Sequence, residues 1–213
     1  MLLAEDVLWL AYPAGCPICE LAQCDCRPGP VREILSKPSL TNLAFIDGLT
    51  QAGNRAAFDR DVSDMQNEKQ RVATPIVCIR VDVDDFKSIN DRYSHAAGDD
   101  ALEHVVNTIR QKVRARDRVY RVGGDEFAIL CPDLSALEAT GMLQRVQAFL
   151  KNKPFMVATR EGATAPKQIT LSVGIDVCNE ARLLSECFEN ADQAAIASKS
   201  NGKDRITVFE PSK

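Results

Sequence analysis

The stretch that decides the fold is Arg121-Val122-Gly123-Gly124-Asp125-Glu126-Phe127-Ala128-Ile129-Leu130. The runs on either side of its glycine pair, Val119–Val122 and Phe127–Cys131, are rich in β-branched and aromatic residues. Two such runs around a Gly-Gly pair predict a tight β-hairpin whose central residues have positive φ. Asp125 and Glu126 then project from the tip, either to meet a cation or a substrate or simply as acidic turn residues.

The bulk composition restricts the function. The chain has 213 residues and a net charge of -4, which gives no support for binding a nucleic acid polymer. The apolar residues near the N-terminus are interrupted by Glu5 and Asp6 and are too few to span a bilayer. No basic start or unbroken apolar run suggests a secretory signal. We therefore expect a cytoplasmic protein without membrane insertion, whose cysteines stay reduced.

Residues 1–40 form a separate cysteine-rich segment, and residues 41–213 form the main domain. The segment holds four closely spaced thiols, at Cys16, Cys19, Cys24 and Cys26. Four thiolates are enough for a tetrahedral structural Zn²⁺, although the two pairs are closer together than in standard zinc knuckles. Redox-responsive thiols and an inert linker remain open as alternatives.

Upstream of the hairpin, a buried strand runs directly into a helix. Residues 76–82 are almost continuously apolar, which is typical of a strand buried on both faces. The helix that begins near Phe86 would leave its first amide groups free for phosphate, with Asp82 placed to hold a cation beside them. Asp84 or Asp85 is expected to cap this helix.

Two further helices are expected before the hairpin, besides one over residues 31–43. One follows Asn54, a suitable N-cap. Another follows Asp99, which is either its N-cap or a functional residue, and carries an apolar stripe.

Downstream, the pattern predicts a helix over 134–150, a strand over 168–177, a helix over 183–200 and a final strand over 205–209. Gly174 marks a point of close backbone approach. Lys199 and Lys203 flank the end of the last helix, where they either complement its dipole or bind phosphate. This order predicts an α+β, ferredoxin-like sandwich with a mostly antiparallel five-stranded sheet. In that fold Asp82 and Asp125 converge, so a cation site would be built from carboxylates.

Several blocks of the sequence together resemble the GGDEF-domain diguanylate cyclase family. The pentapeptide from Gly123 to Phe127 is the family's signature. Similar blocks occur in order at Asp47–Arg55, Asp82–Asp99 and Ala191–Lys203. The resemblance covers nearly the whole chain after the cysteine segment and implies a nucleotidyl-cyclase-like sandwich.

The resemblance implies an enzyme that condenses two GTP molecules into cyclic di-GMP and releases two pyrophosphates. Each subunit of a homodimer would hold one GTP facing the other. Two Mg²⁺ (or Mn²⁺) ions would be held by Asp82, the carbonyl of Val83 and Asp125, and would stabilise the attacking and leaving oxygens. Asp125 or Glu126 would help to deprotonate the attacking 3′-hydroxyl.

The resemblance also implies roles in nucleotide binding. Asn90 and Asp99 would recognise guanine, and His95 would lie near the base or the sugar. Phe86 and Lys87 would offer backbone amides to the phosphates, and Gly123 and Gly124 would let the nucleotide lie close to the backbone. Lys199 and Lys203 would supply positive charge. Arg114 and Asp117 have the spacing of the family's product-inhibition site, where arginine can pair with guanine O6 and N7.

The chain departs from the family pattern near its end. Lys203-Asp204 stands where the family has Arg-Asn, and lysine offers a point charge in place of a planar fork. The alternative function is a catalytically idle module that acts as a receptor for cyclic di-GMP or GTP. Intact Asp82, Asp125 and Lys199 favour the enzyme, because a receptor has no need of a metal site.

Overall fold

The computed structural model describes residues 44–69, 74–158, 163–179 and 182–210. The helix expected over residues 31–43 lies outside them. In chain order the elements are α4 (Arg55–Lys69), β1 (Ile76–Val83), α5 (Phe86–Arg92), α6 (His95–Arg110), β2 (Arg118–Arg121), β3 (Glu126–Pro132), α7 (Ala136–Asn152), β4 (Phe155–Ala158), β5 (Thr164–Lys167), β6 (Leu171–Cys178), α8 (Leu184–Ser200) and β7 (Arg205–Val208).

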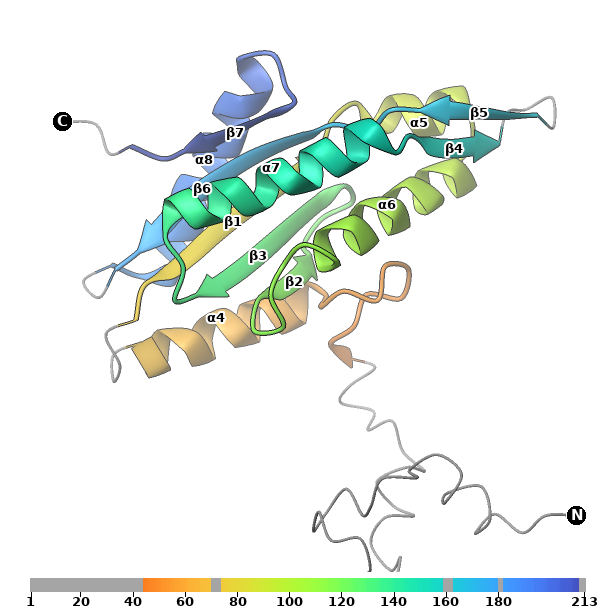
Figure 1. The fold of residues 1–213 in the computed structure, drawn as a ribbon. Coiled ribbons are helices and arrows are strands. Elements are labelled where there is room, and N and C mark those ends of the chain that lie inside the picture. The colour runs from red at the N-terminus through yellow and green to blue at the C-terminus, as the bar shows by residue number, and fades with distance from the viewer. Residues whose placement is uncertain (1–43, 70–73, 159–162, 180–181, 211–213) are drawn as a thin grey trace, which may run out of the picture. The chain divides into compact units, whose positions relative to one another are not determined.

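Five strands form one sheet in the order β2-β3-β1-β6-β7 (Figure 1). β1 pairs antiparallel with β3 and β6, and β2 pairs antiparallel with β3. β7 adds to the edge of β6 in parallel. The predicted α+β sandwich with a mostly antiparallel sheet is therefore confirmed, and the β2–β3 hairpin carries the glycine turn.

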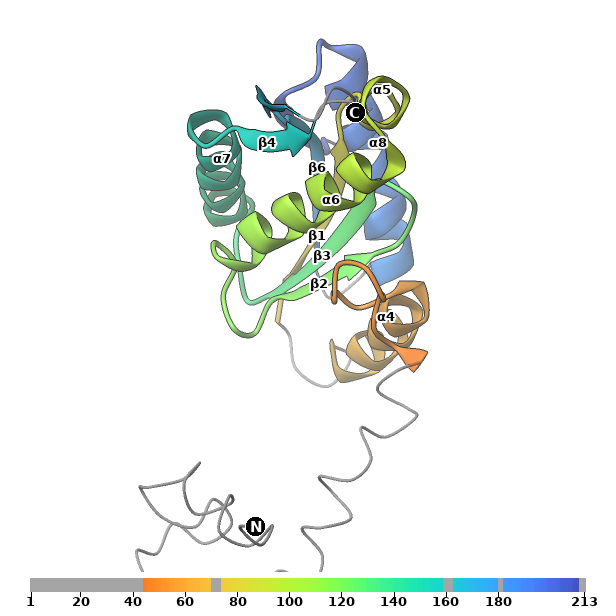
Figure 2. The same ribbon diagram turned by 90° about the vertical axis from the view of Figure 1, so that its right-hand side faces the viewer.

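Helices cover both faces of the sheet, with α6 and α7 on one side and α4 and α8 on the other (Figure 2). Successive residues of β1 point to opposite faces because side chains alternate along a strand. Val77 and Ile79 join the core under α6 and α7, and Cys78 joins the core under α4 and α8. Arg80 and Asp82 share the α8 face with Cys78, and both form ion pairs with α8.

The helix ends show which cap predictions hold. Asn54 Oδ1 accepts the Ala57 amide at 3.0 Å, so this predicted N-cap is confirmed. The prediction that the next long helix starts at Asp99 was wrong. Ser94 Oγ accepts the Ala97 amide at 3.1 Å and starts α6 at His95, so Asp99 lies within the helix with an exposed side chain.

The glycine turn differs from the tight turn with positive φ that the sequence predicts. β2 ends at Arg121 and β3 begins at Glu126, and the Val122 amide donates to the Glu126 carbonyl at 3.0 Å. Neither Gly123 nor Gly124 has a positive φ, because the longer loop closes without that conformation. A side chain at Gly123 would instead collide with Glu126, whose Oε2 would lie 2.8 Å from the new Cβ.

The small antiparallel sheet of β4 and β5 was not predicted. Each strand has four residues, and β5 contains Pro166, which cannot donate a ladder hydrogen bond. Gly174 in β6, by contrast, lies where it was predicted to matter. An added Cβ there would collide with the α8 backbone at Ala191 and Ala195, so only glycine lets this helix lie so close to the sheet.

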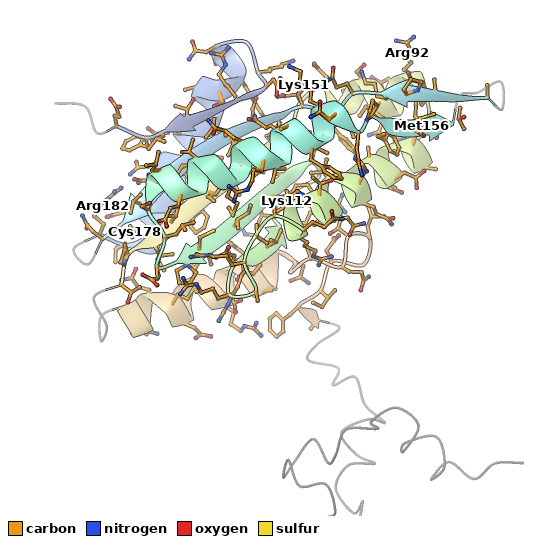
Figure 3. The ribbon with its side chains drawn as sticks, in the orientation of Figure 1. Arg92, Lys112, Lys151, Met156, Cys178 and Arg182 are labelled. Carbon is orange, nitrogen blue, oxygen red and sulfur yellow. The ribbon has the colours of Figure 1, made fainter. Side chains whose placement is uncertain are left out.

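Side chains extend both between these layers and outward from them, as Met156 of β4 does with 56% of its surface exposed (Figure 3). At one end of the sheet, the Cys178 thiol donates to the Arg182 carbonyl at 3.4 Å. Among the helices in the described ranges, none is both long and apolar enough to cross a membrane.

Candidate active site

The end of β1 and the tip of the β2–β3 hairpin meet at one edge of the sheet. Asp82 and Glu126 are register partners on neighbouring strands. The Val83 amide donates to the Asp125 carbonyl at 3.2 Å, which ties the hairpin tip to the end of β1. The predicted convergence of Asp82 and Asp125 is confirmed, and Glu126 lies with them.

Asp82 is a buried carboxylate with a cationic partner from α8. Lys199 Nζ lies 2.6 Å from Asp82 Oδ2. Burial raises the pKa of Asp82, Lys199 opposes that rise, and the neighbouring charges of Asp125 and Glu126 add to it. Burial lowers the pKa of Lys199, but the contact with Asp82 outweighs this and the net shift is upward. The arrangement is a cluster of three acids with a shortage of positive charge.

Glu126 has a cationic partner that the sequence did not suggest. Arg80 Nη2 lies 3.2 Å from Glu126 Oε2, and Arg80 Nε lies 3.2 Å from Asp192 Oδ1. These residues surround a cavity of about 110 Å³ together with Asp82 and Lys199. One signal in the sequence was available: Arg80 is a charged residue that interrupts the apolar run from Ile76 to Val81.

Asp84 holds the segments around the site together. Its carboxylate accepts the Ser172 hydroxyl at 2.6 Å, the Thr170 hydroxyl at 2.7 Å and the Asp204 amide at 3.1 Å. The expectation that Asp84 caps the following helix was therefore wrong for this residue. Its buried side chain instead ties β1 to β6 and to the loop before β7.

Asp85 occupies the N-cap position of α5 without capping it through its side chain. Its φ is 55°, in the left-handed region, and its carboxylate pairs with Lys203 Nζ at 2.6 Å. Lys203 and Asp204 also have positive φ, at 60° and 45°. Strained backbone of this kind clusters at functional sites, and here it aims Lys203 toward the start of α5.

The start of α5 and the first turns of α6 lie together. Phe86 and Lys87 open α5, and the Lys87 side chain is exposed. Asn90 packs against Gly98 so closely that a Cβ at Gly98 would collide with Asn90 Oδ1. Among the described residues, Asn90 Oδ1 and His104 Nε2 are the buried side-chain polar atoms without a hydrogen-bond partner. Asn90 Oδ1 is therefore a buried acceptor without a partner, and it lies against Gly98, the residue before Asp99.

Comparison with known proteins gives the family of this chain. The family described as "Diguanylate cyclase, GGDEF domain" matches residues 44–205. This chain belongs to the GGDEF family.

Relatives of this GGDEF chain include two bacterial proteins. "Probable diguanylate cyclase DgcT" of Escherichia coli K12 is 30% identical over 78% of this chain and 36% of its own length. "Diguanylate cyclase DgcP" of Pseudomonas aeruginosa is 33% identical over 78% of this chain and 24% of its own length. The chain thus spans about a third of the length of DgcT and about a quarter of the length of DgcP.

A solved structure shares the fold of this GGDEF chain. The coiled coil and GGDEF domain of DgcB from Caulobacter crescentus, in complex with c-di-GMP, superimposes with a TM-score of 0.75 at 29% identity. The match covers 84% of this chain and 91% of that one. The fold of the GGDEF domain is therefore shown both by its own topology and by its relative.

The acidic edge of the GGDEF domain suits a hard cation such as Mg²⁺. Such an ion prefers oxygen ligands and commonly takes one or two carboxylates, with substrate phosphates completing the shell. Asp82, Asp125 and the carbonyl of Val83 supply oxygens of this kind, and Lys199 already places a cation on Asp82. No three His, Cys, Asp or Glu side chains form a complete ligand set in the part of the chain that the structure describes. The donor set therefore fits an ion that arrives with a nucleotide.

Arg114 and Asp117 of the GGDEF domain contact each other. Arg114 Nη2 lies 2.7 Å from Asp117 Oδ1, and the Asp117 side chain has no exposed surface. The same guanidinium donates to the carbonyls of Pro132 at 2.9 Å and Asp133 at 3.1 Å. The Arg114–Asp117 pair thereby links the end of β3 to the loop after α6.

The predicted zinc ligands Cys16, Cys19, Cys24 and Cys26 lie outside the described residues. The boundary near residue 40 stays a prediction for the same reason. His95, the first residue of α6, has an exposed side chain.

Proposed function

We propose that this chain is a diguanylate cyclase that condenses two GTP molecules into cyclic di-GMP and releases two pyrophosphates. The observation that carries the proposal is the buried Asp82 carboxylate, held by Lys199 beside Asp125 and Glu126. A buried acid whose pKa is raised by burial and by neighbouring carboxylates, with a lysine in contact, is typical of sites for phosphoryl and nucleotidyl transfer.

Asp82, the carbonyl of Val83 and Asp125 would hold Mg²⁺ or Mn²⁺, with two ions per site. Bound there, the ions would neutralise phosphate charge and stabilise the attacking and leaving oxygens. Lys199 is then free to leave Asp82 for a phosphate oxygen. Its side chain is long, 42% exposed and lines the cavity, so the ammonium can move once a metal ion replaces it on Asp82.

The triphosphate would lie over the start of α5. Phe86 and Lys87 offer backbone amides there, because the first amides of a helix have no partner within it. Lys203 is aimed at the same place through its contact with Asp85. Lys199, which is paired with Asp82, is the second cation near the acidic edge.

Guanine would lie beside Asn90 and Asp99. The unpaired acceptor on Asn90 suits the N–H donors of guanine, and the exposed Asp99 carboxylate is a second acceptor nearby. Adenine lacks a donor at the corresponding N1 position, so it would leave the buried acceptor unsatisfied. His95 would contact the base or the sugar.

The reaction joins one GTP to the other across a homodimer. Asp125 or Glu126 takes the proton from the 3′-hydroxyl of one GTP. That oxygen then attacks the α-phosphorus of the GTP held by the facing subunit, and the bond to pyrophosphate breaks. The same step repeated in the other direction closes the ring. Gly123 and Gly124 let the nucleotide approach the hairpin backbone.

Cyclic di-GMP would inhibit the enzyme at Arg114 and Asp117. To bind guanine O6 and N7 with its planar fork, Arg114 must exchange its contacts with the carbonyls of Pro132 and Asp133. Product binding would therefore loosen the link between the end of β3 and the loop after α6.

The test is to incubate the protein, stripped of bound nucleotide, with GTP and Mg²⁺ and to measure cyclic di-GMP. Asp125→Asn should abolish synthesis, and Asp59→Asn, an exposed acid paired with Arg55 on α4, should not. Absence of product at high protein concentration would refute the cyclase. Binding of cyclic di-GMP or GTP without synthesis would instead establish the receptor.

A further inference from the structure

We propose that Arg80 is a positioning residue of the cyclase: it fixes the Glu126 carboxylate at the hairpin tip and is itself held by Asp192 of α8. This inference rests on the proposed function. It concerns one charged side chain that lies between the hairpin acid Glu126 and Asp192 of α8.

The sheet provides a place for this long side chain. The register partners of Arg80 are Ala128 on β3 and Gly174 on β6, both of which are small. Gly174 lets the α8 backbone lie against the sheet, which brings Asp192 of α8 within reach of the Arg80 guanidinium. The Arg80 side chain is accordingly only 15% exposed, although it carries a full charge.

The contacts indicate that Asp192 orients Arg80 and that Arg80 in turn orients Glu126. Arg80 reaches Glu126 through Nη2 and Asp192 through Nε, each at 3.2 Å. A planar guanidinium held at one nitrogen by Asp192 has a fixed orientation, so its other nitrogen presents a fixed donor to Glu126. Glu126 is 43% exposed and would otherwise sample several rotamers.

A purely structural role for Arg80 accounts less well for these contacts. α8 is already packed against the sheet at Gly174, where its backbone approaches β6 closely. Glu126 and Asp192 are about half exposed, so water could solvate both carboxylates if Arg80 were absent. The fold therefore has little need of this bridge, whereas an acid that must meet a 3′-hydroxyl does need a fixed position.

The experiment compares Arg80→Met and Arg80→Lys with the wild type. For each protein, kcat and KM are measured for cyclic di-GMP synthesis. Calorimetry measures the Kd of 3′-deoxy-GTP with Mg²⁺, because this analogue binds but has no attacking hydroxyl. Arg80→Met should lower kcat about tenfold or more, with Kd unchanged within about twofold. Arg80→Lys should recover part of kcat, since lysine keeps the charge but cannot bridge both acids.

Asp192→Asn provides the second arm of the test. It loosens Arg80 without touching Glu126, so kcat should fall less than in Arg80→Met. Because Asp192 acts through Arg80, the double variant should be no slower than Arg80→Met alone. Melting temperatures of all variants establish that each one is folded.

Three results would overturn the proposal. One is a kcat of Arg80→Met within about twofold of the wild type. Another is a weakening of analogue binding as large as the loss of kcat/KM, which would place Arg80 in binding or folding. The third is a double variant whose loss equals the product of the single losses. If the wild type makes no cyclic di-GMP at all, the cyclase proposal itself fails and this role fails with it.

Discussion

Arg114→Ala should destabilise the domain substantially, although the position resembles a regulatory site. The substitution removes the guanidinium that lies 2.7 Å from Asp117 and leaves that fully buried carboxylate without its cation. Breaking a buried ion pair by removing one partner costs about 3–5 kcal/mol. Arg114 is 32% exposed, and its backbone amide still donates to Asp117 Oδ2 at 2.7 Å, so we expect about 2–3 kcal/mol.

Urea denaturation followed by circular dichroism at neutral pH measures this loss. The corresponding fall in melting temperature is about 4–12 °C for a domain of this size. Arg116→Ala is the matched control, because Arg116 forms an exposed pair with Asp133. Exposed pairs contribute at most about 1 kcal/mol.

Adding Asp117→Asn to Arg114→Ala should restore part of the stability, because it removes the unpaired buried charge. This double variant also tests whether Arg114→Ala affects inhibition through the inhibition site or only through reduced stability. If inhibition by cyclic di-GMP is lost in Arg114→Ala and stays lost in the restabilised double variant, the loss comes from the Arg114–Asp117 site and not from reduced stability. Equal stability of Arg114→Ala and Arg116→Ala would refute the reasoning about the buried pair.

Three further predictions concern the site and its supports. Gly174→Ala should cost about 3 kcal/mol or more, because the new Cβ would collide with the α8 backbone at Ala191 and Ala195, whereas Gly48→Ala, with open space around it, should leave the urea midpoint unchanged. Asp82→Asn should abolish synthesis yet raise the melting temperature at neutral pH, because burial raises the pKa of Asp82 and its charged form destabilises the fold. The gain in melting temperature should vanish as the pH falls through that raised pKa, where Asp82 itself becomes neutral. A gain that persists in acid would contradict this explanation. Asp84→Asn should weaken GTP binding in calorimetry by freeing the loop before β7, and unchanged binding would show that this loop needs no anchor.

The framework of the fold could be predicted because local patterns determine it. β1 is an apolar run, the hairpin is two β-rich runs around glycines, and α8 ends at a glycine signal. The convergence of Asp82 with Asp125 followed from the hairpin, because β1 lies next to β3. These inferences needed the identity of neighbouring elements and not the exact position of any side chain.

The contacts that support the site could not be predicted, because they join residues distant in sequence. Arg80 meets Glu126 and Asp192 only after three elements are assembled, and its own neighbours in sequence indicate nothing but a buried strand. Asp84 looked like a helix cap by position, yet hydroxyls from β6 compete for its carboxylate. The periodicity of apolar residues indicates which face of a helix or strand a residue occupies, but it does not indicate which distant side chain that residue will contact.

The pairing of Lys199 with Asp82 and of Lys203 with Asp85 has a consequence for turnover. In a cyclase, each aspartate acts as an internal competitor of the nucleotide for its lysine. The competition lowers the affinity for the incoming triphosphate, and it equally offers each lysine a resident counter-ion when pyrophosphate departs. If the chain is the proposed cyclase, these pairs would help pyrophosphate to leave, at the expense of weaker binding of GTP.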